Sequence, residues 1–189
     1  HHAKLYHLGF SAVVARNTLS HANEKRDWRI YRDFATILIT EARRLCINDK
    51  LPTLEISEAI YVIDSTTIEL GLSLFPWAKF STKQASIKLH LSLELHGNIP
   101  SFFSFSSGKT ADVLFLDTIK FETGAYYIFD RGYLDFGRFY EINQAGAFFI
   151  TRAKTIWSFR RLYSNPIDKN TGIRCDQIVV QGRHHHVNR

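Results

Sequence analysis

The hydrophobic pattern of the middle of the chain predicts three strands joined by short connections. Residues 61–70 form an apolar, β-branched run, and a loop or turn is expected over 72–83. Apolar and polar residues then alternate from Ile87 to Leu95, as in a strand with one wet face. His96-Gly97-Asn98 has the composition of a hairpin turn and leads into a return strand over 99–106. These segments predict an antiparallel meander.

The second half of the core changes to alternating strands and helices. Residues 125–129 and 147–150 are continuous apolar runs, which predict strands buried on both faces. Apolar residues at helical spacing predict helices over 112–121 and 134–145. Strands separated by helices become parallel neighbours. The predicted fold class is therefore α/β, with a mixed sheet and flanking helices.

A long amphipathic helix is predicted before the sheet, over residues 28–47. Its apolar stripe repeats at steps of three and four and comprises Tyr31, Phe34, Leu38, Ala42 and Leu45. Residues 11–26 are polar and read as short helices or turns. The periodicity favours a helix that packs on the core, and a role in a DNA-binding head is the alternative.

The composition of the chain indicates a folded domain rather than a membrane or secreted protein. A chain of 189 residues with 45% hydrophobic residues suits one folded domain, and no apolar run approaches the ~20 residues of a membrane span. The chain has neither a signal peptide nor any methionine, so we expect a fragment of a longer protein. Its two cysteines, Cys46 and Cys175, lack zinc-ligand spacing and favour a reducing cytosol.

The positive charge lies at one end of the chain. Residues 151–189 contain eight Lys/Arg and two Asp, a net +6 that equals the charge of the whole chain. The first 150 residues are neutral. A basic segment indicates a polyanionic partner, usually nucleic acid. A solvated basic loop is an equally good interpretation of the charge alone.

Two aspartates in apolar strands are the candidates for chemistry. Asp64 lies in Tyr61–Leu70, and Asp130 ends the apolar run at 125–129. If the two strands are parallel neighbours, both carboxylates meet where ligands bind in open α/β sheets. A shared Mg²⁺, with Mn²⁺ as the alternative ion, would offset the cost of burying them and would support metal-dependent phosphodiester chemistry. The ordinary alternatives are a strand-edge acid paired with a lysine for Asp64 and a turn former for Asp130. Glu69 is not a third ligand, because it faces the opposite side of a regular strand from Asp64.

Several basic residues are candidates for DNA phosphate contacts. They are Lys83, Lys88, Arg131, Arg152, Lys154, Arg160 and Arg161. Trp157 lies among cations and is a candidate for stacking on an unpaired base. Plain surface charges and a packing tryptophan are the alternatives.

Six ordered blocks resemble the catalytic domain of bacterial insertion-sequence transposases of the DDE class. The blocks are Asp64-Ser65-Thr66-Thr67, Leu74–Ala78, Ile87–His90, Gly97–Pro100, Asp130–Tyr133 and Ala147–Lys154. The resemblance implies a ribonuclease-H-like fold, Mg²⁺ dependence and cut-and-paste DNA transposition. It makes Asp64 and Asp130 the first and second catalytic aspartates. The family's third residue is a glutamate on a later helix, beyond a β-rich insertion, and this sequence stops before it.

These inferences define the expected organisation and function. Residues 1–50 form a helical segment of the DNA-binding or linker region, 51–155 an incomplete ribonuclease-H-like core, and 156–189 the start of a basic, β-rich insertion. The protein is expected to cleave and join DNA as a homo-oligomer in a synaptic complex, away from membranes, in the bacterial cytoplasm at the nucleoid. The alternatives are a related metal-dependent nuclease and a non-catalytic DNA-binding remnant. We expect weak or no cleavage by these 189 residues alone.

Overall fold

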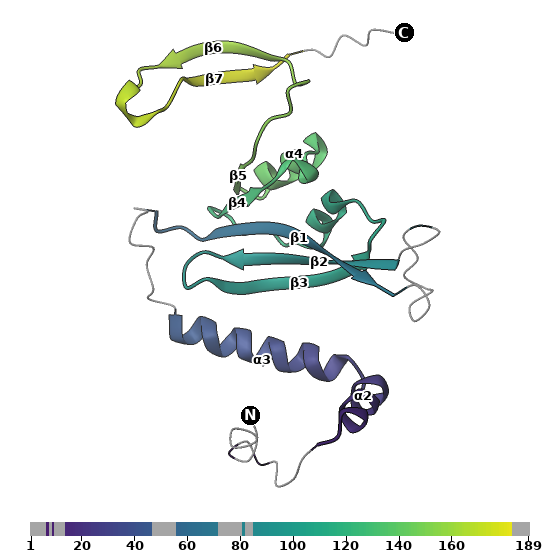
Figure 1. Cartoon of the computed structure of the whole chain (residues 1–189). Helices are drawn as coiled ribbons and strands as arrows, with labels where there is room; N and C mark the ends of the chain where they lie inside the picture. The colour runs from purple at the N-terminus through teal and green to yellow at the C-terminus, as the bar shows by residue number, and fades with distance from the viewer. Residues whose placement is uncertain are drawn as a thin grey trace.

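A five-stranded mixed sheet forms the centre of the protein. The computed structural model describes residues 7, 9, 14–46, 56–71, 81 and 85–182. The strand order is β3-β2-β1-β4-β5, as Figure 1 shows. The strands are β1 (Ile60–Leu70), β2 (Ala85–Glu94), β3 (Ile99–Ser107), β4 (Tyr126–Phe129) and β5 (Phe148–Ile150). β1, β2 and β3 pair antiparallel, whereas β4 and β5 join parallel to β1 and to each other. The predicted mixed sheet with a three-strand meander is confirmed.

Helical segments lie on both sides of the sheet (Figure 1). One side carries η2 (Asp112–Thr118), η3 (Arg131–Tyr133) and α4 (Phe136–Gln144). The other side carries α3 (Arg29–Cys46), which follows α2 (Arg16–Lys25). The predicted helix over 112–121 is a shorter 3₁₀ segment, and Asp135 caps α4 by accepting a hydrogen bond from the backbone N–H of Arg138.

The hydrophobic core lies between the sheet and the η2–α4 layer. Alternate residues of β1 and β4 point into it, and their partners come from η2, η3 and α4. The core residues of these elements are Tyr61, Ile63, Phe115, Leu116, Tyr127, Phe129, Tyr133, Phe139 and Ile142. A bidentate ion pair from Arg138 to Asp117, with both distances 2.6 Å, ties α4 to η2 at the rim. The core therefore fixes the segment that carries Asp130 against β1.

The predicted burial of the parallel strands on both faces is wrong. Only Tyr127 and Phe129 of β4 are buried, and all three residues of β5 are exposed, with Phe148 at 53% and Ile150 at 51%. The reason is position, because β5 is the outer strand of the described sheet and pairs with β4 alone. A continuous apolar run cannot distinguish an edge strand from a central one.

The predicted inward face of the long helix is also wrong. Tyr31, Phe34, Leu38 and Leu45 are at least half exposed, and no residue of α3 is fully buried. The half-buried positions are Ala35, Ile39, Ala42 and Cys46, of which only Ala42 belongs to the predicted stripe. Small residues on this stripe leave an apolar groove of about 490 Å³ between α3 and strands β2 and β3. The helix does lie on the domain, but through its smaller apolar stripe.

A separate β-hairpin follows the sheet. Strands β6 (Phe159–Asn165) and β7 (Asp176–Gln181) pair antiparallel, with a register shift between Arg161 and Tyr163. Nearly every residue of the hairpin is exposed. The 3₁₀ turn η4 (Lys169–Thr171) lies between its strands. The predicted β-rich character of this region therefore has a structural counterpart.

Some sequence predictions lie outside the described residues. These are most of the loop at 72–83, including Lys83, and the last seven residues of the chain. Among the helices that the structure describes, none is long and apolar enough to cross a membrane. Within the described residues, Cys46 and Cys175 form no disulfide with each other.

Candidate functional site

The register of β1 and β4 brings Asp64 and Asp130 to adjacent positions. Val62 pairs with Ile128 and Ile63 with Phe129, so the next residue on each strand is an aspartate. Asp130 keeps an extended backbone, with φ −82° and ψ −174°. Asp64 is thus the β1 residue directly after the last register pair, and Asp130 directly follows β4 beside it.

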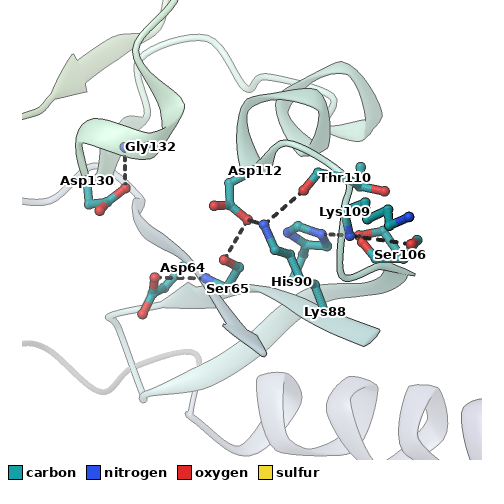
Figure 2. Close-up of polar contacts among 11 residues, drawn as sticks. Asp64, Ser65, Lys88, His90, Ser106, Lys109, Thr110, Asp112, Asp130 and Gly132 are labelled. Atoms are coloured by element: carbon teal, nitrogen blue, oxygen red, sulfur yellow. Dashed lines mark hydrogen bonds and ion pairs between the residues drawn. The ribbon is translucent and has the colours of Figure 1, made fainter. Parts of the chain in front are cut away.

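One backbone hydrogen bond orients each carboxylate (Figure 2). The N–H of Ser65 donates to Asp64 Oδ1 at 2.8 Å, and the N–H of Gly132 donates to Asp130 Oδ1 at 2.7 Å. No hydrogen bond from another described residue reaches either Oδ2. Both aspartates are exposed, so the premise that a cation must offset their burial is wrong. The site is instead an open pair of carboxylates at the place where β4 ends.

A third carboxylate, Asp112, approaches this site from η2. Its Oδ1 accepts hydrogen bonds from Ser65 Oγ at 2.8 Å and from Lys88 Nζ at 2.9 Å (Figure 2). A Cβ built on Gly132 would lie 3.0 Å from Asp130 Oδ1 and 3.5 Å from Asp112 Oδ2. Glycine at position 132 thus leaves room for both carboxylates. The sequence analysis did not single out Asp112, because only the fold places η2 beside Ser65.

Lys88 and Asp112 form a half-buried ion pair behind the two aspartates. Partial burial opposes ionisation of Asp112, but the hydrogen bonds from Lys88 and Ser65 outweigh it and lower the pKa of Asp112. The side chain of Lys88 is only 15% exposed, and its Nζ also donates to the Thr110 carbonyl at 2.8 Å. Lys88 therefore acts inside the protein, and its predicted contact with a DNA phosphate has no support in this geometry.

Tyr133 completes the inner side of the site. Its side chain is 1% exposed, and its hydroxyl has no hydrogen bond of good geometry with any described residue. Burial raises the pKa of Tyr133, the neighbouring Ser65 hydroxyl opposes this, and the charges of Asp112, Asp64 and Asp130 raise it further. The charges of three carboxylates therefore act on the one buried hydroxyl of Tyr133.

The other basic residues that were predicted to contact DNA lie in different parts of the structure. Arg131 directly follows Asp130, and Arg152 and Lys154 follow β5, and all three are exposed. Arg160 and Arg161 are exposed on β6 of the separate hairpin.

The indole of Trp157 packs instead of standing free. Its ring lies 4.8 Å from the ring of Phe136 and 5.8 Å from that of Phe159, measured between centroids. The packing interpretation of Trp157 is therefore the one that the structure supports.

The donor set of the aspartate pair suits a hard cation. Carboxylate oxygens are the ligands that Mg²⁺ prefers, and Mg²⁺ commonly binds through one or two carboxylates while it keeps several waters. Asp64 and Asp130 offer two exposed carboxylates at neighbouring positions, one on β1 and one directly after β4. Within the described part of the chain, no group of three or more acidic, histidine or cysteine side chains is arranged to hold a metal ion. Asp64 and Asp130 are therefore the two candidate ligands that the described residues offer.

The fold is a mixed α/β sheet that carries Asp64 on β1 and Asp130 directly after the neighbouring strand β4. Residues 56–188 match the family model described as "Transposase DDE domain". The chain belongs to this transposase family. It is also 37% identical over 94 residues to a protein of Sinorhizobium fredii (strain NBRC 101917 / NGR234) named "Putative transposase y4zB". That alignment covers 50% of this chain and 26% of the relative. No solved structure matches the chain significantly.

Proposed function

We propose that this chain is the aspartate-bearing part of an enzyme that cuts and joins DNA strands during transposition of an insertion element. The observation that carries the proposal is the adjacent register of Asp64 and Asp130 in a chain of the transposase DDE family. The strand order β3-β2-β1-β4-β5 and the helices on both faces support a ribonuclease-H-like fold.

In this proposal each aspartate has a defined task. Asp64 and Asp130 would hold Mg²⁺, or Mn²⁺ in its place, and the ion would supply Lewis acidity for phosphodiester chemistry. The backbone N–H groups of Ser65 and Gly132 fix one oxygen of each carboxylate, which leaves the other for the ion. Neither aspartate transfers a proton. The exposed Arg131 beside Asp130 is placed to contact a DNA phosphate.

The wider assignments follow from the family and remain part of the proposal. The substrate is DNA at the element ends and at the target, bound by a homo-oligomer in a synaptic complex. The proposed site of action is the bacterial cytoplasm at the nucleoid. The three-part division into residues 1–50, 51–155 and 156–189 belongs here as well, with the β6–β7 hairpin as the start of the insertion.

One observation favours a second function, a non-catalytic DNA-binding remnant. The described residues offer two carboxylates rather than a full metal cluster. Under this alternative the basic C-terminal region binds DNA and no strand is cut.

The proposal predicts that Asp64→Asn and Asp130→Asn abolish cleavage in the complete gene product and leave DNA binding unchanged. The amide keeps the shape of the carboxylate but loses the charge that holds the cation. The measurement is cleavage and joining of a labelled DNA substrate in Mg²⁺ and in Mn²⁺, beside a binding assay. The matched control is Glu69→Gln, an exposed acid on the same strand, which is expected to cleave like the unmodified protein.

Each other outcome rejects a stated part of the proposal. Wild-type cleavage by either aspartate variant would falsify the assignment of that residue. Nicking without joining would identify a nuclease. Salt-sensitive binding with no cleavage in either metal would identify the remnant.

A further inference from the structure

The Tyr133 hydroxyl is a buried polar group that the proposed function does not use. The side chain is among the largest fully buried ones, yet its hydroxyl lacks a partner among the described residues. Buried hydroxyls are nearly always hydrogen-bonded, so an exception needs an explanation. The groups around it are the Ser65 hydroxyl and the carboxylates of Asp112, Asp64 and Asp130.

Counting donors and acceptors identifies the partner that Tyr133 can take. Ser65 Oγ donates its proton to Asp112 Oδ1 at 2.8 Å, so its lone pairs remain available to accept. A Tyr133 O–H is a donor and needs an acceptor. A hydrogen bond from Tyr133 to Ser65 would complete a chain that runs from Tyr133 through Ser65 to Asp112, where Lys88 already donates at 2.9 Å.

Each end of this chain is attached to one of the two aspartates. Ser65 orients Asp64 through its own backbone N–H. Tyr133 belongs to η3, which Asp130 caps, and the Tyr133 N–H donates to the Asp130 carbonyl at 3.3 Å. A hydrogen bond between the Tyr133 and Ser65 side chains would therefore link β1, which carries Asp64, to η3, which Asp130 caps.

We propose that Tyr133, Ser65 and Asp112 are positioning residues for the aspartate pair. The Tyr133 hydroxyl donates to Ser65, Ser65 donates to Asp112, and the closed chain holds Asp64 and Asp130 at the separation at which both bind one divalent cation. The inference rests on the proposed function, since it assumes that the two aspartates bind the metal. Residues that orient metal ligands typically alter metal affinity ten- to a hundredfold when they are changed.

The test measures Mn²⁺ binding by electron paramagnetic resonance on the 189-residue chain and, separately, unfolding in urea. Tyr133→Phe removes one oxygen and keeps the ring. We expect a roughly tenfold weaker Mn²⁺ affinity, with stability little changed because a single hydrogen bond contributes only a small net amount to folding. Ser65→Ala is expected to weaken Mn²⁺ binding similarly. Ser65→Thr keeps a hydroxyl and suits a strand, so it is expected to bind Mn²⁺ like the unmodified chain.

The outcomes separate this inference from the proposed function. If Asp64→Asn abolishes Mn²⁺ binding but Tyr133→Phe and Ser65→Ala bind normally, the positioning role is wrong and the metal assignment stands. If Tyr133→Phe loses stability and affinity in parallel, or Ser65→Thr fails to restore affinity, the role is structural. If Asp64→Asn and Asp130→Asn both bind Mn²⁺ normally, the metal assignment itself is wrong, and the inference falls with it.

Discussion

At the scale of single residues, the polar groups beneath the site are held in defined charge states. His90 on β2 is 2% exposed and lies 4.9 Å from the ring of Phe115, between centroids. Its Nε2 lies 2.7 Å from Ser106 Oγ, and its buried Nδ1 has no hydrogen-bond partner among the described residues. Burial lowers the pKa of His90, the charge of Asp112 opposes this, and the charge of Lys88 adds to it. The folded protein therefore favours the neutral ring.

The stability of the protein should fall in mild acid because of His90. A histidine has a pKa near 6.5 in the unfolded chain, and the folded value is lower. The unfolded state consequently binds more protons, so the contribution of His90 is complete above about pH 6.5 and declines as the pH falls towards the folded pKa.

The measurement is urea unfolding at pH 7.5 and pH 5.5. We expect the unfolding free energy to drop more for the unmodified chain than for His90→Gln, which does not titrate. At pH 7.5 the variant should itself cost about 1 kcal/mol, as typical single substitutions do. Equal pH dependence of the two proteins would contradict this account.

At the scale of elements, the tight turn between β2 and β3 approaches the C-terminal end of α3. The connection between β2 and β3 carries two left-handed residues, Gly97 with φ +82° and Asn98 with φ +53°. A Cβ on Gly97 would lie 2.7 Å from the Cβ of Cys46 at the end of α3. Nearby, Arg43 of α3 forms an ion pair with Glu94 of β2 at 2.7 Å. Because α3 is otherwise loosely packed, this corner is a main attachment of the helix to the sheet.

Gly97→Ala is therefore expected to destabilise the protein by about 2–5 kcal/mol. The left-handed conformation costs an alanine roughly 1–2 kcal/mol, and the close approach to Cys46 adds an overpacking cost of about 1–3 kcal/mol. Gly124→Ala is the matched control, since Gly124 has φ +83° with nothing within 4 Å of its built Cβ. Urea unfolding of both variants separates the two costs. Equal losses would show that the α3 contact contributes nothing.

At the scale of the whole molecule, the net positive charge lies on the segments that follow the five-stranded sheet. Arg152, Lys154, Arg160 and Arg161 are all exposed there. Adjacent residues of a strand point to opposite faces, so Arg160 and Arg161 cannot both face the same flat surface. DNA bound along one face of the hairpin would contact one arginine of this pair.

DNA binding by the 189-residue chain should become less salt-dependent when this pair is neutralised. Each phosphate contact contributes about 0.9 to the slope of log affinity against log salt concentration. We expect Arg160→Gln with Arg161→Gln to lower the slope by about 1, measured by fluorescence anisotropy on a duplex.

Lys109→Gln with Lys120→Gln removes the same charge from exposed positions outside the predicted DNA contacts, and should leave the slope unchanged. An unchanged slope in the arginine variant, or an equal fall in the lysine variant, argues against a hairpin contact.

The sequence by itself determined where the strands of the sheet lie and which of them run parallel or antiparallel. It also determined that Asp64 lies within one strand and that Asp130 follows another. These features depend on local periodicity, on turn residues such as Gly97, and on connection lengths, all of which are written along the chain. The family resemblance to DDE transposases was likewise carried by contiguous blocks, and the family comparison confirms it.

Only the tertiary structure decided which faces are covered and which side chains meet. In the structure, β5 and both aspartates are exposed, and α3 packs through Ala35 and Ile39. Asp112 accepts hydrogen bonds from Ser65 and Lys88, and Tyr133 is buried nearby. Burial depends on what packs against a segment, and these contacts link residues that are far apart in the chain. Local sequence patterns do not predict such contacts, because an apolar run or a single aspartate has the same sequence pattern at the edge of a sheet as at its centre.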